Sequence, residues 1–368
     1  MKYLEGQEMK LKVGIVGLGK MGIIRRRVLE DHPHADVVAV CDPTLENQKN
    51  REGGVLQTTD YQEVLQEDLD VLFACTPNNV TAEVVVAGIK KGLHVFCEKP
   101  PGRDLTDTRA ILEAASHKPE LKIKFGFNHR YHDNVIQAHA LLQSERLGKL
   151  LWMRGVYGKS GGVGFEEGWR SDRRTAGGGI LLDQGIHMLD LFRLFGGEFH
   201  DVRSMVTNSY WPIEIEDNAF ALLRNQEGVV AVLHSSSTHW KHTFLLDLCF
   251  TEGHLALEGI LSSTGSYGPE MLIVSRRQFE DETFALGKPR QEVVYFDTDR
   301  SWEREIQEFV DCIVNDKPIE VGTLDDAWRT MELVYKIYAA DELWRHASAA
   351  GEELKRSTDR LRGQEETP

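Results

Sequence analysis

The residues of greatest chemical interest in this chain are an imidazole and two carboxylates that follow a run of three glycines. Asp183, His187 and Asp190 are spaced four and then three residues apart. On a helix this spacing places all three side chains on one face. His187 could act as an acid or base near neutral pH, with Asp183 orienting it. The three side chains could instead hold a metal ion, or satisfy one another inside a core helix.

A glycine-rich loop near the N-terminus predicts a second site. A buried strand over residues 11–17 leads directly into this loop, and a helix-like run follows to about residue 30. In a G-x-G-x-x-G pattern the first glycine permits a tight turn, the second admits a pyrophosphate, and the third lets the helix pack closely on the strand. We therefore expect a dinucleotide to bind at Gly17, Leu18, Gly19, Lys20, Met21 and Gly22.

A carboxylate after the next strand bears on the choice of dinucleotide. Asp42 ends a strand-like run over residues 36–42 and lies 20 residues after Gly22. A carboxylate at that distance accepts hydrogen bonds from the adenosine ribose hydroxyls and repels a 2′-phosphate. The sequence therefore favours NAD over NADP, although Lys49 and Arg51 lie close enough in sequence to keep NADP open.

Strand-like and helix-like segments alternate up to about residue 127, which predicts a doubly wound parallel sheet. Ligands of such sheets bind beyond the carboxyl ends of the strands. The residues at those ends, which should surround one crevice, are Gly17, Asp42, Thr76, Lys99 and Asn128. Lys99 could donate a hydrogen bond to a developing alkoxide there. The alternative is an ordinary surface lysine in a turn.

From residue 128 the pattern changes to successive strands without long helices between them, which predicts an α+β domain with a large, mostly antiparallel open sheet. The expected strands cover residues 150–157, 201–210, 217–224, 229–237, 243–251, 254–258, 271–276 and 292–296, and helices return at 301–315 and 324–347. We expect a dinucleotide-binding domain over residues 1–127, a substrate and oligomerisation domain over 128–346, and a polar tail over 347–368. An open sheet leaves a face that another subunit often covers.

Composition excludes several classes of partner. The chain has 368 residues and a net charge of -15, which disfavours nucleic acid. The local exception, Arg25-Arg26-Arg27, we interpret as a solvated helix face. No apolar run approaches the roughly 20 residues that span a bilayer, and residues 1–10 lack the apolar core of a signal peptide. The five cysteines include no C-x-x-C, so we expect no disulfide framework or zinc site and a cytoplasmic protein.

Three histidines close in sequence, His234, His239 and His242, form a further candidate metal site. No charged ligand accompanies them, and in strands they would lie on both faces of the sheet. We therefore expect no metal there. His239 or Trp240 could instead contact substrate or a neighbouring subunit.

A series of short motifs links these sites. In chain order they are Gly-Leu-Gly-Lys-Met-Gly, Cys-Asp-Pro, Thr-Pro-Asn, Glu-Lys-Pro, Gly-Phe-Asn-His-Arg-Tyr, Gly-Trp-Arg and the segment from Gly177 to Asp190. Over about residues 10–346 the chain resembles the Gfo/Idh/MocA oxidoreductase family, which includes glucose–fructose oxidoreductase and inositol dehydrogenase. The combination of Glu-Lys-Pro with Asp-x-Gly-x-His is the most specific part of this resemblance.

The resemblance implies a Rossmann domain, followed by a sheet domain that carries the substrate and forms dimers or tetramers. It implies that Lys99, Asp183 and His187 are catalytic. The implied cofactor contacts beyond the glycine loop and Asp42 are Thr76, Pro77, Asn78, Glu98, Lys99, Asn128, Trp169 and Arg170. The implied substrate contacts are Lys99, Arg130, Tyr157, Arg170, Asp183 and His187. One position departs from the family: Thr81 stands where a histidine often follows Thr-Pro-Asn.

The expected reaction transfers a hydride between NAD and a secondary alcohol of a sugar or polyol. Either His187, as a general base, or Lys99 is the immediate proton partner of the reacting oxygen. Asp183 holds the imidazole or contacts a neighbouring hydroxyl. No metal is expected, because Lys99 supplies the positive charge. Two alternatives are an NAD-dependent glycoside hydrolase of the same fold and a non-catalytic ligand sensor.

Overall fold

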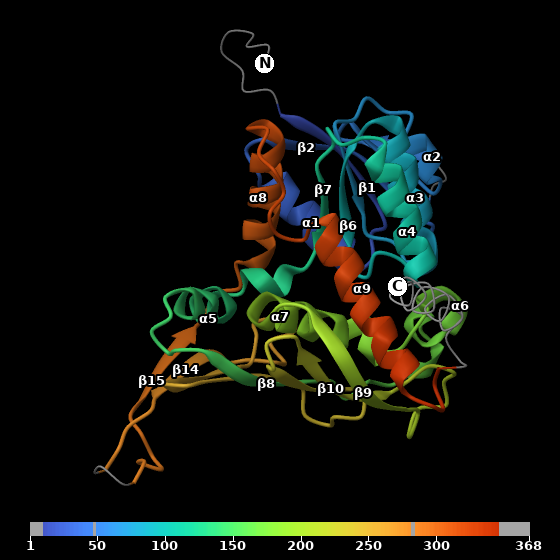
Figure 1. Cartoon of the computed structure of the whole chain (residues 1–368). Coiled ribbons are helices and arrows are strands. Elements are labelled where there is room, and N and C mark those ends of the chain that lie inside the picture. Colours follow the sequence, from blue (N-terminus) through green and yellow to red (C-terminus); the bar gives the residue numbers. More distant parts are fainter. Residues whose placement is uncertain (1–9, 47–48, 281–283, 346–368) are drawn as a thin grey trace, which may run out of the picture. The chain divides into compact units, whose positions relative to one another are not determined.

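The computed structural model describes residues 10–46, 49–280 and 284–345, which form two compact units (Figure 1). The first unit comprises the described residues up to Asn128 together with Ser301–Trp328. The second comprises His129–Arg300 and the described residues from Arg329 onward. The first division lies next to the predicted boundary, but Ser301–Trp328, which we expected in the second domain, belongs with the first unit. The predicted tail over 347–368 lies outside the described residues.

A mainly parallel sheet organises the first unit. Its strands are β1 (Leu11–Val16), β2 (Ala35–Cys41), β3 (Lys49–Glu52), β4 (Val55–Thr58), β5 (Val71–Ala74), β6 (His94–Glu98) and β7 (Ile123–Gly126). In the described chain they lie in the order β3-β4-β2-β1-β5-β6-β7, and each pair is parallel except the β3–β4 hairpin. The predicted doubly wound sheet is thus confirmed. The sequence did not indicate the hairpin, because all four residues of β3 are exposed and polar.

Helices cover both faces of this sheet (Figure 1). They are α1 (Lys20–Glu30), α2 (Tyr61–Val64), α3 (Asn78–Lys91), α4 (Leu105–Ser116) and α8 (Ser301–Val314). Helices α1 and α8 pack together on one face, and α3 and α4 pack together on the other. Asp104 caps α4 by accepting hydrogen bonds from the amides of Thr106 and Asp107.

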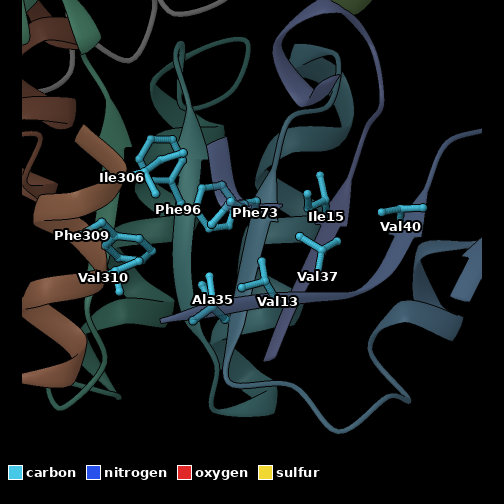
Figure 2. Close-up of a cluster of buried hydrophobic side chains, with 12 residues drawn as sticks. Val13, Ile15, Ala35, Val37, Val40, Phe73, Phe96, Ile306, Phe309 and Val310 are labelled. Carbon is cyan, nitrogen blue, oxygen red and sulfur yellow. The ribbon is translucent and has the colours of Figure 1, made fainter. Parts of the chain in front are cut away.

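Helix α8 completes the core of the first unit (Figure 2). Its apolar side chains Ile306, Phe309 and Val310 are buried in one cluster with side chains of β1, β2, β5 and β6. The Phe309 ring meets the Phe73 and Phe96 rings edge-on, with centroids 5.9 and 5.6 Å away. The helix therefore buries its apolar face against the first sheet, which explains why this late segment belongs to the first unit.

A buried arginine joins α1, β6 and α8. The Arg25 guanidinium is inaccessible to solvent. Its Nε donates to Glu98 Oε1 at 2.7 Å and its Nη2 donates to Glu305 Oε2 at 2.6 Å. The same group lies over the rings of Phe96 and Trp302, 4.3 and 4.7 Å from their centroids. One cation therefore compensates carboxylates from two different elements.

The interpretation of Arg25-Arg26-Arg27 as a solvated helix face is wrong for Arg25. Arg26 does fit it, because its partly exposed side chain pairs with Glu30 one turn later at 2.7 Å. The three adjacent arginines point in different directions around α1. A run of like charges therefore conceals one side chain that faces the core.

Two carboxylates around one arginine affect how the core responds to pH. Burial raises the pKa of Glu305 to about 7, although the positive charges of Arg25 and Lys124 act to lower it. Among the described residues, neither Glu305 Oε1 nor Arg25 Nη1 has a hydrogen-bond partner, so their burial is incompletely compensated. Because the folded pKa lies above the ordinary value of 4.5, the stabilising contribution of Glu305 decreases as pH rises from 4.5 through about 7.

The second unit is built on a mostly antiparallel sheet, as predicted. Its strands are β8 (Leu150–Gly158), β9 (Phe199–Thr207), β10 (Asn218–Asn225), β11 (Val230–Ser236), β12 (Thr243–Phe250), β13 (Gly253–Glu258), β14 (Glu270–Arg276) and β15 (Gln291–Phe296). In the described part of this unit the order is β15-β14-β13-β12-β8-β11-β10-β9. The central pair β8–β11 is parallel, and the other pairs are antiparallel.

Helices lie over one face of this second sheet (Figure 1). They include α5 (Asp133–Gln143) and α7 (Ile186–Gly196), together with a short α6 (Arg173–Ala176) in a loop. Helix α9 (Leu324–Ala340) begins in the first unit and continues into the second. In the described ranges no helix is both long and apolar enough to cross a membrane.

Replacing Arg25 by alanine tests the buried ion pairs. The change leaves Glu98 and Glu305 buried without their counter-charge, so we expect Arg25→Ala to lower the free energy of unfolding by about 3–5 kcal/mol. Urea unfolding at pH 8 measures this difference. The matched control is Arg26→Ala on the same helix, which should change stability by less than about 1 kcal/mol. Equal stability of the two variants would contradict the assigned role of Arg25.

Candidate functional site

The glycine loop between β1 and α1 is tight where it meets the sheet and open where a ligand would approach. Gly17 has a φ of +96°, and a Cβ there would lie 2.3 Å from the carbonyl oxygen of Cys75. A Cβ on Gly22 would lie 1.9 Å from the carbonyl oxygen of Gly17. A Cβ on Gly19 would meet no described heavy atom within 4 Å. Gly19 is also the residue just before α1 and provides no side-chain cap, so the helix N-terminus is suited to an anion.

The carboxylate of Asp42 lies beside this loop and is held by hydrogen bonds. Its Oδ2 accepts from the amide of Leu18 at 2.6 Å. Its Oδ1 accepts from the Thr44 amide at 2.9 Å and from the Thr44 hydroxyl at 2.6 Å. Burial works against the charged form, but these bonds from Thr44 and Leu18 outweigh it and lower the pKa of Asp42. Asp42 is thus an anion at neutral pH, and Oδ2, which accepts one bond from Leu18, retains capacity to accept from a ribose hydroxyl.

The segment after β5 is ordered by its own hydroxyl groups. Pro77 precedes α3, and Asn78 is the first residue of that helix. The hydroxyl oxygens of Thr76 and Thr81 lie 3.0 Å apart, and the Thr81 hydroxyl also lies 3.1 Å from the Pro77 carbonyl oxygen. Thr81 is almost fully buried. Thr81, at the position where we noted a departure from the family's histidine, therefore stabilises the turn that carries Thr76, Pro77 and Asn78.

Lys99 follows directly after the last residue of β6, where the chain is firmly anchored. Glu98 is buried and accepts the hydrogen bond from Arg25, so its carboxylate faces the interior of the unit. Lys99 itself is partly buried. Asn128 is also buried, and its Nδ2 donates to the Ser301 hydroxyl at 3.3 Å. Of the predicted residues at this end of the sheet, Glu98 and Asn128 thus have clear structural roles.

Asp183 lies in an unusual turn and contacts two cations. The expected helix is present, but its first turn, Leu181–Gly185, is π-helical and leads into α7. Asp183 Oδ2 accepts from Lys159 Nζ at 2.9 Å, and Oδ1 accepts from Arg170 Nε at 3.2 Å. The Arg170 guanidinium in turn lies over the Trp169 ring, 4.2 Å from its centroid. Single π-helical turns within helices occur frequently at functional sites.

His187 is part of a buried group of rings. It is 4% exposed, and its ring stacks on that of His129 with centroids 3.7 Å apart and planes 15° from parallel. His129 Nε2 lies 3.0 Å from the Tyr157 hydroxyl. Burial raises the pKa of Tyr157 well above its ordinary value, so this hydroxyl remains protonated. Tyr157, a predicted substrate contact, therefore also supports the histidine stack.

Asp190 and Arg130 form a buried ion pair with two parallel hydrogen bonds. Arg130 Nε and Nη2 donate to the two oxygens of Asp190 at 2.7 and 2.6 Å. This pair joins the turn Asn128–Tyr131 to α7 and engages the guanidinium that we predicted to contact substrate. Asp190 thus anchors the Arg130 guanidinium to α7. No three described His, Cys, Asp or Glu side chains are grouped so that they could hold a metal ion.

The glycines before Asp183 have a role that the sequence did not indicate. The buried Glu216 carboxylate accepts from the amides of Gly179 and Leu181 at 2.8 and 3.0 Å, and from the Tyr338 hydroxyl at 2.6 Å. A Cβ on Gly178 or Gly179 would lie 2.4 Å from the Tyr338 hydroxyl or 2.0 Å from the Glu216 carbonyl oxygen. These two glycines therefore admit Glu216 and Tyr338.

Comparison with known proteins agrees with this geometry. Residues 11–124 match the model of an oxidoreductase family with an NAD-binding Rossmann fold, and residues 135–256 match the GFO/IDH/MocA C-terminal domain. Together the two models match well over half of the chain. The chain belongs to the Gfo/Idh/MocA family. This confirms the predicted family, the predicted Rossmann domain and NAD as the predicted cofactor.

Individual members of the Gfo/Idh/MocA family match most of the chain. Levoglucosan dehydrogenase of Pseudarthrobacter phenanthrenivorans is 24% identical over 67% of this chain and 73% of its own length. Myo-inositol 2-dehydrogenase of Thermotoga maritima is 27% identical over 61% and 68%. The solved structure of levoglucosan dehydrogenase with NADH and levoglucosan has a TM-score of 0.76 at 19% identity and covers 90% of this chain and 97% of that one.

The sequence did not indicate a role for three residues of the site. Lys159 pairs with Asp183, His129 stacks on His187, and Glu216 holds the turn before Asp183. Of these only His129 stands within a quoted motif, Gly-Phe-Asn-His-Arg-Tyr. Lys159 and Glu216 lie 24 and 37 residues from their partners, and neither stands in a motif.

Replacing Asp42 by alanine tests the cofactor preference. The variant loses the anion that accepts from ribose and repels a 2′-phosphate, so we expect the ratio of NADH to NADPH affinity to fall roughly 10- to 100-fold, the worth of a hydrogen bond to a charged group. Fluorescence titration with each reduced cofactor measures the ratio. Asp36→Ala, at an exposed position of the same strand, is the control and should leave the ratio unchanged. An unchanged ratio in Asp42→Ala would refute the assignment.

Proposed function

We propose that this protein is an NAD-dependent dehydrogenase or reductase acting on a secondary alcohol of a sugar or polyol. The substrate class rests on the activities for which the sequence relatives are named. They are named for levoglucosan, myo-inositol and 1,5-anhydro-D-fructose, which are sugars or polyols. When bound, the nicotinamide supplies the hydride chemistry. The residues of this chain bind and orient the alcohol and move its proton.

His187 is the proposed general base. It takes the hydroxyl proton of the alcohol at an imidazole nitrogen, or returns it in the reverse direction. Its burial and its stacking on His129 fix the plane of the ring, which supports this role. Lys99 donates a hydrogen bond to the reacting oxygen and offsets its developing negative charge.

Asp183 is proposed to orient the substrate or the imidazole. The ion pairs with Lys159 and Arg170 limit the rotation of its carboxylate. A carboxylate held in this way can accept from a sugar hydroxyl next to the reacting carbon. Arg170, nearly half exposed and stacked on Trp169, can donate to a further oxygen of the ligand.

Alanine variants test these roles. Lys99→Ala or His187→Ala should lower turnover by a factor on the order of 10²–10⁴, the usual contribution of a positioned acid or base, while NADH binding is retained. The absorbance of reduced nicotinamide measures turnover. Lys90→Ala and His200→Ala, at exposed positions, are the matched controls and should retain activity. Wild-type turnover in both Lys99→Ala and His187→Ala would refute the proposed site.

The substrate class is tested with a panel of free sugars, inositols, sugar phosphates and nucleotide sugars. Each compound is offered with NAD and NADP, while reduced nicotinamide is followed by its absorbance. Reduction with at least one sugar or polyol supports the proposal. Release of sugar from a glycoside without net reduction would replace it with the glycoside hydrolase. Sugar binding without any turnover would replace it with the ligand sensor.

We also propose that a second copy of the chain covers the open face of the second sheet. On β10, Phe220 and Leu222 are exposed while the residues on either side of them are buried. The register places Leu222 opposite Val232 and Phe220 opposite Met205, which are exposed too. These side chains therefore form an apolar patch, which supports association through the sheet in a dimer or tetramer.

A lysine in this patch tests the association. Leu222→Lys places an unpaired charge in the interface, so we expect the molar mass from light scattering to fall toward that of one chain. Ile136→Lys changes a side chain of α5, on the helix-covered side of the sheet, and is the control. An unchanged molar mass in Leu222→Lys, or a monomeric wild type, would refute the open face as the interface.

A further inference from the structure

A row of aromatic side chains lies on loops at one end of the second sheet. The ring centroids of Phe165 and Trp211 are 4.7 Å apart, those of Trp211 and Tyr210 are 5.0 Å apart, and those of Tyr210 and Trp240 are 5.0 Å apart. Their loops follow β8, β9 and β11. The pairing gives these three strands the same direction, so their carboxyl ends and these loops share one end of the sheet.

The row begins at the proposed catalytic carboxylate. Lys159 Nζ lies 2.9 Å from Asp183 Oδ2 and 5.4 Å from the centroid of the Phe165 ring. Phe165 is the first ring of the row. Successive contacts therefore lead from Asp183 through Lys159 and Phe165 to the rings of Trp211, Tyr210 and Trp240.

The outer end of the row is open to solvent. Tyr210 and Trp240 are 61% and 62% exposed, although aromatic side chains of this size gain much from burial. The two rings meet at 72°, so they do not cover each other's faces. Adjacent exposed aromatic rings are typical of a surface that binds a ligand or another protein.

The loop that carries Tyr210 and Trp211 is held rigidly. One buried carboxylate, Asp217, accepts from three successive amides: Ser209 at 2.9 Å, Tyr210 at 2.7 Å and Trp211 at 3.2 Å. The indole of Trp211 donates to the Ser237 carbonyl oxygen at 3.0 Å. The rings are therefore positioned before any ligand arrives, which lowers the entropic cost of binding.

Close backbone packing holds the middle ring in place. A Cβ on Gly161 would lie 2.3 Å from the six-membered ring of Trp211, so only glycine leaves room for the indole there. Gly161 lies in the same loop as Lys159, two residues further along the chain. The loop that supplies the partner of Asp183 thus also packs on the aromatic row.

We propose that Trp211, Tyr210 and Trp240 form a platform for the second pyranose ring of a di- or oligosaccharide whose terminal ring is oxidised beside Asp183. This inference rests on the proposed function and specifies its substrate class. The C–H bonds on a pyranose face carry partial positive charge, which complements the negative face of an aromatic ring. The Trp240 indole and the Tyr210 hydroxyl can hydrogen-bond to the sugar hydroxyls at the edge of that ring.

A kinetic comparison of sugars of different length tests the platform. With saturating NAD, Trp240→Ala should raise the KM for maltose or cellobiose on the order of tenfold, which corresponds to about 1.4 kcal/mol. The kcat and the KM for glucose should remain unchanged, because the platform does not contact the reacting ring. Tyr295→Ala, which removes an equally exposed ring of β15, is the matched control. It should leave the KM for the disaccharide and the KM for glucose unchanged.

Calorimetric titration of the NADH-bound protein with the same three sugars gives a readout independent of turnover. Tighter binding of a disaccharide than of glucose, weakened in Trp240→Ala and in Tyr210→Ala but not in Tyr295→Ala, supports the platform. Equal binding of both sugar sizes, or no effect of either platform variant, overturns it and leaves the dehydrogenase proposal standing. Platform-dependent binding with no oxidation of any sugar overturns the dehydrogenase proposal alone.

Sedimentation of the variants separates a sugar platform from a contact between subunits. Trp240→Ala should sediment as the wild type does. Dissociation of an oligomer on this substitution would assign the exposed rings to a subunit interface and would overturn the platform.

Discussion

The first unit depends on one guanidinium that is buried between two carboxylates. A buried ion pair tolerates no loss of a partner, because the remaining charge is left without compensation. Arg25 can be buried only when β6 delivers Glu98 and α8 delivers Glu305. Helix α1 begins at the glycine loop, and β6 ends next to Lys99. The same contact therefore positions the helix at the dinucleotide site and the strand that leads to the proposed catalytic lysine.

The second unit uses two adjacent carboxylates in the same way. Glu216 holds the amides of Gly179 and Leu181, and Asp217 holds those of residues 209–211. Both precede β10, and neighbouring side chains of an extended chain point to opposite sides. One short stretch of backbone thus anchors the turn that carries Asp183 on one side and the aromatic loop on the other.

Features with local signals could be predicted from the sequence, and features that depend on distant partners could not. The glycine loop, most strands and the helix with Asp183 and His187 are encoded by short-range spacing and apolar runs. The burial of Arg25 depends on partners 73 and 280 residues away, so the arginine run indicated a solvated face. The apolar face of α8 was evident, but no local sequence pattern indicates which of the two sheets this helix covers. Lys159 beside Asp183 is likewise a product of the tertiary fold.

The return of α8 to the first sheet affects how the chain can fold during its synthesis. Glu305 and Phe309 are translated only after the whole stretch His129–Arg300 of the second unit has been synthesised. Until then the emerging first unit has a sheet face that α8 does not yet cover and an arginine that lacks one of its two carboxylates. The second unit also needs a later segment, because Tyr338 of α9, which donates to Glu216, follows α8 in the chain. The dinucleotide-binding unit is therefore the first to be started, yet it cannot be completed until most of the second unit has been synthesised.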